Sequence, residues 1–232
     1  MYNKREEIYN DVDLVTINSP HSIISEEFRT LRTNIQFSMF DRSFKTILIT
    51  SSVSSEGKST IAANLAVIFS TQGKKVLLVD ADLRRPSLHR KFGLPNNRGL
   101  TSFLIGSEPS LSLILDKPYK ENLHVLTSGL VPPNPSELLA SQRMTDFIET
   151  TKEHFDIIIF DAPPVIAVTD AQILASKIDG TVFVVRNGLA ERHKLIKAKE
   201  QLKKVNANVI GTVFNEKKKI KSNDYGYYRT NE

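Results

Sequence analysis

The sequence contains no cysteine and no tryptophan among its 232 residues, and aromatic residues make up only 8% of it. The absence of cysteine excludes a disulfide framework, a thiol nucleophile and a cysteine-ligated metal site. Long apolar runs are also missing. Residues 59–73, one of the longest uncharged stretches, fall short of the roughly 18 apolar residues that a membrane-spanning helix needs. No apolar segment follows the charged N-terminus, so the sequence predicts no signal peptide and a cytoplasmic protein.

Charge and length place the chain in an ordinary globular class. Hydrophobic residues make up 40% and charged residues 25%, a balance that excludes wholesale disorder. The net charge of +5 permits a nucleic acid or an anionic membrane as a partner without indicating either. At roughly 150 residues per domain, the length predicts one large domain with short appendages. We assign an N-terminal segment to residues 1–18, the domain to 19–215 and a flexible tail, poor in apolar residues, to 216–232.

The apolar pattern predicts strands that alternate with helices. An amphipathic helix begins near Pro20, with Ser22 or Ser25 as its N-cap and with Ile24, Phe28, Leu31 and Ile35 on its apolar face. The predicted strands are residues 46–50, 75–79, 123–126, 155–160, 181–185 and 209–214. Such strands, separated by helices, predict an α/β fold with a mostly parallel sheet covered by helices on both faces. Ligands of these folds bind beyond the carboxyl ends of the strands.

A serine-rich turn after the first strand ends in Gly57-Lys58-Ser59, which fits the phosphate-loop pattern except that Ser52 replaces its first glycine. In this turn, successive backbone N–H groups and a helix N-terminus face the β-phosphate of a nucleotide. Lys58 would bridge the β- and γ-phosphate oxygens, and the hydroxyl of Ser59 would hold Mg²⁺. The residues expected to bind the nucleotide are Ser54, Ser55, Glu56, Gly57, Lys58, Ser59 and Thr60. The sequence therefore predicts a P-loop NTPase.

Aspartates follow two further strands. Asp80 and Asp82 stand at the end of the second strand, and Asp161 follows the fourth. Carboxylates gathered at strand ends are costly unless a cation neutralises them, and Mg²⁺ beside the phosphate loop can be that cation. A single aspartate in such a place is often only a helix cap, whereas three beside a phosphate loop indicate function.

The motifs around these aspartates resemble those of the bacterial tyrosine kinases, cytoplasmic ATPase-like enzymes of capsule and exopolysaccharide export. An apolar run leads into Asp80-Ala81-Asp82-Leu83-Arg84, and another leads into Asp161-Ala162-Pro163-Pro164. The resemblance extends from about Ser19 to the end of the chain and includes the segment Thr169-Asp170-Ala171-Gln172. Within this family, the sequence resembles the free-standing kinases of Gram-positive bacteria, whose transmembrane activator is a separate polypeptide.

The resemblance implies roles for the residues of the site. ATP and Mg²⁺ are the implied cofactors, with Lys58, Asp80 and Asp82 as catalytic residues. Ser59, Asp82 and Asp161 are the implied metal ligands, and Asp80 is expected nearest to the incoming tyrosine. Asn215 corresponds to a base-contacting position in related ATPases, and the alternative role for it is that of a turn residue. Arg84 and Arg85 contact either phosphate or substrate, or else form surface ion pairs.

The implied acceptor and partners lie towards the two ends of the chain. Tyr225, Tyr227 and Tyr228 cluster in the tail and are the expected sites of autophosphorylation in trans. Glu26, Arg29 and Arg32 fit the family's oligomerisation segment, which implies a homo-oligomeric ring, with a solvated helix face as the other reading. Further implied partners are the transmembrane activator, which recruits the kinase to the inner face of the membrane, and protein substrates of polysaccharide synthesis. A nucleic-acid partner is not expected, because no binding motif is present.

Two other functions are weighed against a kinase. A partition or division-site ATPase would carry a second lysine in the phosphate loop, at the place of Val53, and would lack the terminal tyrosines. A nucleotide-gated adaptor without catalysis would not need the intact Lys58 and aspartates. The loop departs from the family pattern in one respect: it reads Ser54-Ser55-Glu56 where relatives usually have proline and glycine before the final glycine.

Overall fold

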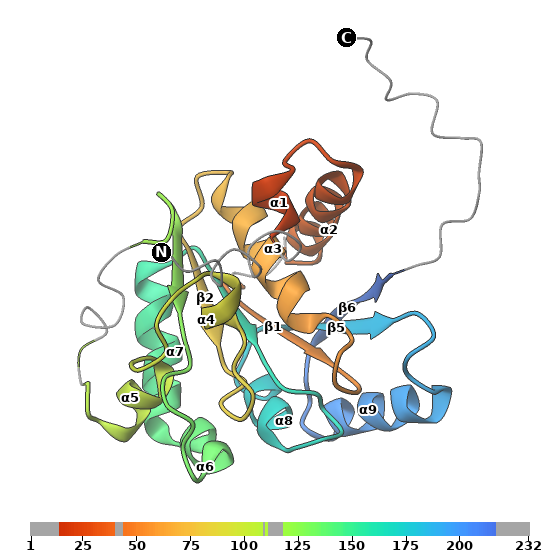
Figure 1. Cartoon of the computed structure of the whole chain (residues 1–232). Helices are drawn as coiled ribbons and strands as arrows, with labels where there is room; N and C mark the ends of the chain where they lie inside the picture. The colour runs from red at the N-terminus through yellow and green to blue at the C-terminus, as the bar shows by residue number, and fades with distance from the viewer. Residues whose placement is uncertain (1–13, 40–43, 109, 111–117, 217–232) are drawn as a thin grey trace, which may run out of the picture.

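A six-stranded parallel sheet forms the centre of the computed structural model, which describes residues 14–39, 44–108, 110 and 118–216 (Figure 1). Its strands are β1 (Thr46–Ser51), β2 (Val76–Asp80), β3 (Leu123–Leu126), β4 (Ile157–Asp161), β5 (Gly180–Arg186) and β6 (Val209–Asn215). They lie in the order β3-β2-β4-β1-β5-β6, and each neighbouring pair is parallel. The predicted α/β architecture is confirmed.

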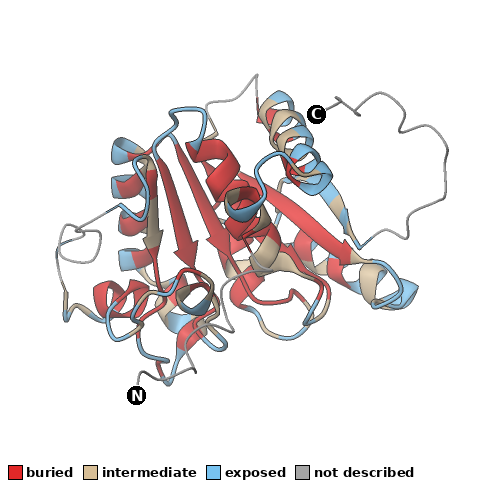
Figure 2. Ribbon diagram, turned by 45° about the horizontal axis from the view of Figure 1, so that its top comes forward, coloured by how far each residue is buried: buried red, intermediate tan, exposed pale blue. Residues whose placement is uncertain are grey.

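Helices cover both faces of the sheet. They are α1 (Val15–Asn18), α2 (Ile23–Met39), α3 (Lys58–Ser70), α4 (Leu88–Lys91), α5 (Leu100–Ile105), α6 (Pro135–Ala140), α7 (Gln142–His154), α8 (Asp170–Ala175) and α9 (Arg192–Lys204). Side chains of α1 to α4 belong to one apolar cluster, and those of α5 to α9 belong to the other. Within β1, Ile47 and Ile49 face the first cluster while Leu48 faces the second. The strands therefore separate two cores, and Figure 2 shows the central strands buried between the helices.

The strand order sets the place of the site. β2, β4 and β1 are neighbours, and the residue pairs Asp80–Asp161 and Ile49–Asp161 are in register. The carboxyl ends of these strands therefore bring the phosphate loop and the aspartates to one edge of the sheet.

The N-terminal helices differ in part from the sequence prediction. Ser22 is the residue that caps α2, because its hydroxyl accepts a hydrogen bond from the N–H of Ser25 (3.2 Å). Ile24 was expected on the buried face but is 52% exposed. Helix α1 was not predicted. It is held by Thr16, whose N–H and hydroxyl both donate to Asn64 of α3 (3.0 and 2.9 Å). Part of the segment 1–18 therefore packs on the domain.

Strand β6 is an exception to the expected burial of the sheet. Its side chains are exposed or half-exposed along its whole length, and Val209 and Phe214 are 46% and 69% exposed. The apolar pattern of the sequence could not reveal this, because it does not say which strand lies at the edge.

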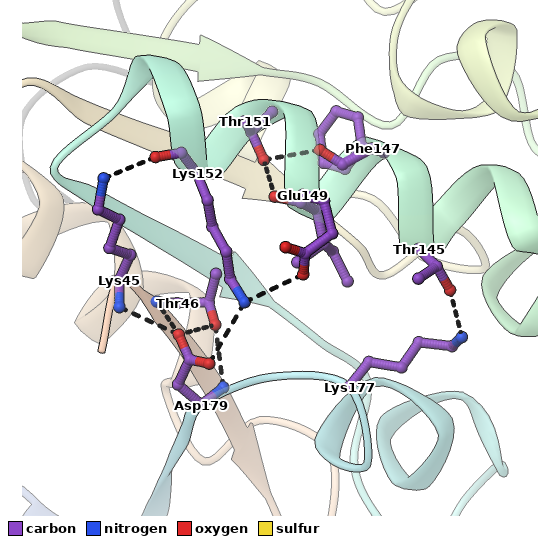
Figure 3. Close-up of polar contacts among 10 residues, drawn as sticks. Lys45, Thr46, Thr145, Phe147, Glu149, Thr151, Lys152, Lys177 and Asp179 are labelled. Atoms are coloured by element: carbon purple, nitrogen blue, oxygen red, sulfur yellow. Dashed lines mark hydrogen bonds and ion pairs between the residues drawn. The ribbon is translucent and has the colours of Figure 1, made fainter. Parts of the chain in front are cut away.

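Asp179, just before β5, binds the amino end of β1 (Figure 3). It lies at the opposite end of the strands from the site. Its Oδ2 accepts hydrogen bonds from the N–H groups of Lys45 and Thr46 (both 3.0 Å) and from the Thr46 hydroxyl (2.7 Å). Lys152 of α7 lies 3.4 Å from Oδ1. Partial burial alone would raise the pKa of Asp179, but these hydrogen bonds and the charge of Lys152 outweigh it and hold the pKa below its ordinary value. Asp179 thus connects β1, α7 and the start of β5.

Among the described residues, no helix combines the length and the apolarity that crossing a membrane requires.

Candidate nucleotide site

A cavity of about 540 Å³ opens at the carboxyl ends of the central strands. Its walls come from the phosphate loop, from the segment after β2 and from the segment after β4. The lining residues are Ser54, Ser55, Lys58, Ser59, Asp82, Arg84, Arg85, Ser87, Pro163, Pro164, Ala167 and Val168. Four of the predicted nucleotide-binding residues are therefore at the cavity, together with one of the three predicted aspartates.

The phosphate loop ends at Gly57, which precedes α3 and needs a left-handed backbone (φ 89°). A Cβ atom at this position would also lie 2.1 Å from Nδ2 of Asn215. Asn215 thus borders the loop, and its Nδ2 donates to the backbone carbonyl of Glu56 (3.0 Å). This contact is a third role, besides the base contact and the turn that the sequence suggested. Thr60 lies just inside α3, where its hydroxyl accepts from Nζ of Lys91 (3.2 Å).

The side chain of Glu56 turns away from the cavity and is fully buried under the loop. Its Oε2 accepts hydrogen bonds from the Ser52 hydroxyl (2.8 Å) and the Val53 N–H (2.9 Å), and its Oε1 accepts from the Arg186 N–H (3.3 Å). Only the backbone of Glu56 remains to serve a phosphate. The sequence motif placed Glu56 in the loop, but it could not show that the carboxylate braces the loop from below.

Lys58 reaches across the cavity to two aspartates. Its Nζ lies 3.2 Å from Oδ2 of Asp82 and 3.6 Å from Oδ1 of Asp161. Burial alone would lower the pKa of Lys58, but the negative charges of Asp161 and Asp82 outweigh it and raise the pKa above its ordinary value. Lys58 therefore stays cationic.

Asp80 lies deeper than the other carboxylates. It is fully buried and does not line the cavity, and its Oδ2 accepts hydrogen bonds from the N–H groups of Ser87 and Leu88 (both 2.9 Å). Burial, reinforced by the charge of Asp161, raises the pKa of Asp80 to about 8. The sequence placed Asp80 nearest to an incoming tyrosine. The structure places it behind Asp82, which lines the cavity.

The donor set fits a divalent cation. Oδ1 of Asp80 is buried without a hydrogen-bond partner among the described residues, and the fully buried Asp161 lies beside Lys58 and Ser59. Burial raises the pKa of Asp161, against the opposing charge of Lys58. In the described part of the chain, no three His, Cys, Asp or Glu side chains converge on a metal site. Mg²⁺ does not need such a cage, because one or two carboxylates and the phosphates of a nucleotide usually hold it.

The sequence indicated Arg84 as a candidate site residue but did not show which residue it pairs with. Its Nε and Nη2 donate to the two oxygens of Asp170 (2.8 and 3.1 Å), a fully buried aspartate at the start of α8. Ser136 bonds to both side chains (2.9 Å to Arg84 and 2.7 Å to Asp170). Arg84 thus forms an ion pair and also lines the cavity. Asp170 was missed as a site residue, because an aspartate at the start of a helix looks like a cap.

The predicted oligomerisation residues have partners within the chain. Arg29 pairs with Glu26 one turn away and also donates to the backbone carbonyl of Pro20 (2.7 Å). Arg32 faces Gln72 at the end of α3, at 3.0 and 3.2 Å when the amide oxygen is turned towards it. Both arginines therefore have partners within their own chain in this structure. The predicted phosphorylation sites Tyr225, Tyr227 and Tyr228 lie outside the described residues.

Comparison with known proteins shows which protein family this chain resembles in sequence and structure. Residues 47–227 match the model of the CobQ/CobB/MinD/ParA nucleotide binding domain. Over 220 residues, the chain is 46% identical to tyrosine-protein kinase YwqD of Bacillus subtilis (strain 168), and the alignment covers 95% of this chain and 92% of YwqD.

Solved structures give the same result. The kinase domain of Escherichia coli tyrosine kinase ETK superposes with a TM-score of 0.85 at 31% identity, covering 98% of this chain and 89% of that domain. The chimerical protein CapA2B2 also has a TM-score of 0.85, at 40% identity, covering 89% of this chain and 91% of the chimera. The septum site-determining protein MinD of Pyrococcus horikoshii OT3, complexed with Mg-ADP, is less similar. Its TM-score is 0.62 at 25% identity, covering 73% of this chain and 69% of MinD.

Proposed function

The chain belongs to the bacterial tyrosine kinases, and we propose that it transfers the γ-phosphoryl group of ATP to tyrosines of its own C-terminal segment. One observation carries the proposal. Lys58, at the start of α3, faces Asp82 and Asp161 across a cavity lined by the phosphate loop. Phosphoryl transfer needs in-line positioning and positive charge at the γ-phosphate more than covalent chemistry; Lys58 would supply the charge and the phosphate loop would position the nucleotide.

The phosphates of ATP would bind at the loop and at the N-terminus of α3. Backbone N–H groups of the loop, the hydroxyls of Ser54 and Ser55, and Nζ of Lys58 are the donors available there. Asn215 borders the loop on the side of β6, and we propose that the base lies near it. To contact a γ-phosphate, Lys58 must exchange at least part of its pairing with Asp82 for the phosphate.

Ser59, Asp82 and Asp161 are the residues that would hold Mg²⁺. The cation, when bound, neutralises charge that develops on the phosphate oxygens. Asp161 fits this role because it is a fully buried carboxylate that lies beside Ser59 and Lys58.

The acceptor tyrosine would enter beside Asp82. A free tyrosine hydroxyl has a pKa of about 10, so a carboxylate that orients it or accepts its proton assists the transfer. Asp82 lines the cavity, whereas Asp80 is fully buried and holds the start of α4. We therefore propose that Asp82 faces the acceptor, while Asp80 keeps the segment after β2 in place.

We further propose that Tyr225, Tyr227 and Tyr228 are the acceptors and that the reaction occurs in trans within a ring. The clustering of three tyrosines in four residues of a polar tail supports their assignment. Glu26, Arg29 and Arg32 remain the proposed contact, and forming it would require Arg29 or Arg32 to give up a partner within its own chain. A separate transmembrane activator and a role in polysaccharide export complete the proposal.

The test is an incubation with ATP and Mg²⁺, with the activator fragment present, followed by mass spectrometry of phosphotyrosine. We expect phosphate on Tyr225, Tyr227 or Tyr228, and loss of most labelling when all three are changed to Phe. Principal phosphate on Tyr2, Tyr9 or Tyr119 would contradict the assignment of the tail. ATP hydrolysis without any tyrosine labelling would instead support the alternative, an ATPase of the partition or division-site type.

A further inference from the structure

Arg186, the last residue of β5, contacts the phosphate loop and the end of β6 at the same time. Its Nη1 donates to the backbone carbonyl of Ser55 (3.2 Å). Its Nε and Nη2 lie 2.8 and 2.7 Å from Oε2 of Glu216, the residue after β6. Its backbone N–H donates to the buried carboxylate of Glu56 (3.3 Å). One residue therefore connects the loop to the point where the chain leaves the sheet.

The sheet holds Arg186 in this place. Arg186 pairs with Asn215 in the β5–β6 register, and Asn187 donates its N–H to the Asn215 carbonyl (3.0 Å). Both residues that the guanidinium contacts have a left-handed backbone, with φ of 66° at Ser55 and 53° at Glu216. Such a backbone is uncommon for residues other than glycine and persists only where the surroundings hold it.

We propose that Arg186 is a positioning residue of the nucleotide site, held in place by Glu216. Arg186 does not line the cavity, so it acts through Ser55 and Glu56. By fixing the Ser55 carbonyl outside the cavity, it keeps the loop N–H groups directed towards the phosphates before the nucleotide arrives. Such preorganisation improves affinity because less ordering is left for the binding step.

The contact with Glu216 also relates the phosphate loop to the C-terminal segment. The tyrosine cluster begins at Tyr225, so Glu216 is the root of the segment that carries the proposed acceptors. Nε and Nη2 of Arg186 both contact Oε2 of Glu216, which holds the guanidinium group in place and leaves Nη1 directed at Ser55. The geometry of the phosphate loop therefore depends on Glu216, the residue that leads into the acceptor segment. This inference rests on the proposed function, since it takes ATP as the ligand of the loop.

The test compares Arg186→Gln, Arg186→Lys and Glu216→Gln with Arg98→Gln. Arg98 is a matched control because it also forms an exposed ion pair with a glutamate (Glu108, 3.2 Å) and does not line the cavity. The measurements are the Kd of ATP with Mg²⁺ by calorimetry, the KM and kcat of autophosphorylation, and the melting temperature. Arg186 and Glu216 are partly exposed and therefore screened, so we expect a change of about three- to tenfold.

We expect Kd and KM to rise in Arg186→Gln and Glu216→Gln, while kcat and the melting temperature stay close to those of Arg98→Gln. Arg186→Lys should recover part of the affinity, because lysine keeps the charge but lacks the fork. A variant that combines Arg186→Gln with Glu216→Gln should lose no more affinity than Arg186→Gln alone, because both changes remove the same contact. Unchanged affinity in Arg186→Gln, an equal loss in Arg98→Gln, or additive losses in the double variant would overturn the assignment. Failure of the unaltered chain to bind ATP would instead refute the proposed function.

Discussion

The ammonium group of Lys58 lies 3.2 Å from a carboxylate oxygen of Asp82, and both groups line the same cavity. The pair is largely buried, with side-chain exposures of 12% for Lys58 and 7% for Asp82. In this state the lysine neutralises carboxylates that a nucleotide-bound cation would otherwise neutralise. Lys58 and Asp82 therefore stabilise each other's charge, and replacing one residue leaves the other without its partner.

Replacing Lys58 with Met should reduce autophosphorylation by on the order of 10²-fold or more, because a charged contact to the γ-phosphate is lost. The same change leaves Asp82 and Asp161 without their counter-charge, so the melting temperature should fall as well. Labelling with ATP and calorimetry measure the two effects. Lys120→Met, at an exposed position, is the control and should change neither. Labelling of Lys58→Met at the rate of the unaltered chain would refute the assignment of the phosphate loop.

Replacing Asp82 with Asn should slow the transfer step far more than it weakens ATP binding, because the phosphate loop remains intact. Asp80→Asn should be milder. Asp80 does not line the cavity, and the amide oxygen of Asn can still accept the hydrogen bonds from the N–H groups of Ser87 and Leu88. Single-turnover kinetics and ATP titration of both variants separate the two steps. An equal loss of transfer in Asp80→Asn would show that the deeper carboxylate acts in its charged form.

Replacing Ser55 with Gly should stabilise the protein by up to about 1 kcal/mol. Ser55 has a φ of 66°, and a left-handed backbone costs a residue with a side chain roughly 1–2 kcal/mol, partly offset by the greater freedom of glycine in the unfolded chain. Ser54→Gly is the control, because Ser54 is not among the residues with positive φ. Denaturant unfolding should show opposite signs for the two variants. A destabilised Ser55→Gly would mean that the Ser55 side chain contributes more than its backbone costs.

Replacing Asp179 with Asn should lower the free energy of unfolding by about 1–3 kcal/mol near neutral pH, since several donors lose a charged acceptor. The pKa of Asp179 is held below its ordinary value of 3.8, so its extra stabilisation is present above that value. This stabilisation is lost as the pH falls through the lowered pKa. Unfolding free energies measured from pH 7 to pH 2 should therefore be less steep at the acid end for Asp179→Asn. Asp146→Asn, on the exposed side of α7, is the control and should keep the slope of the unaltered chain.

Much of the site follows from local sequence. Gly57-Lys58-Ser59 and the aspartates stand directly after strands, so short motifs located them, and apolar runs located all six strands. The contacts that hold the site follow from tertiary structure instead. Arg84 pairs with Asp170, 86 positions later, and Arg186 reaches back to Ser55 over 131 positions. No local pattern encodes such pairs.

The sequence also did not predict which of the site's side chains are buried and which line the cavity. Asp80 and Asp82 look equivalent in the motif, yet only Asp82 lines the cavity, because Asp80 is the last residue of β2 while Asp82 lies in the segment beyond the strand. The sequence assigned Arg32 to the oligomerisation segment but did not show that it faces Gln72, because that contact depends on how α3 packs beside α2. Both differences depend on how elements pack, which periodicity alone does not specify.

The exposure of β6 bears on how the protein comes apart. An edge strand with few buried side chains has little apolar burial to hold it, so we expect it to open at a lower free energy than the central strands. Opening β6 would withdraw Asn215 from the phosphate loop and Glu216 from Arg186, which contacts the loop. Native-state hydrogen exchange would then show β6 and the loop exchanging together, ahead of β1 and β4. The first cooperative unit to be lost would include the place where ATP binds, while the two cores remain folded.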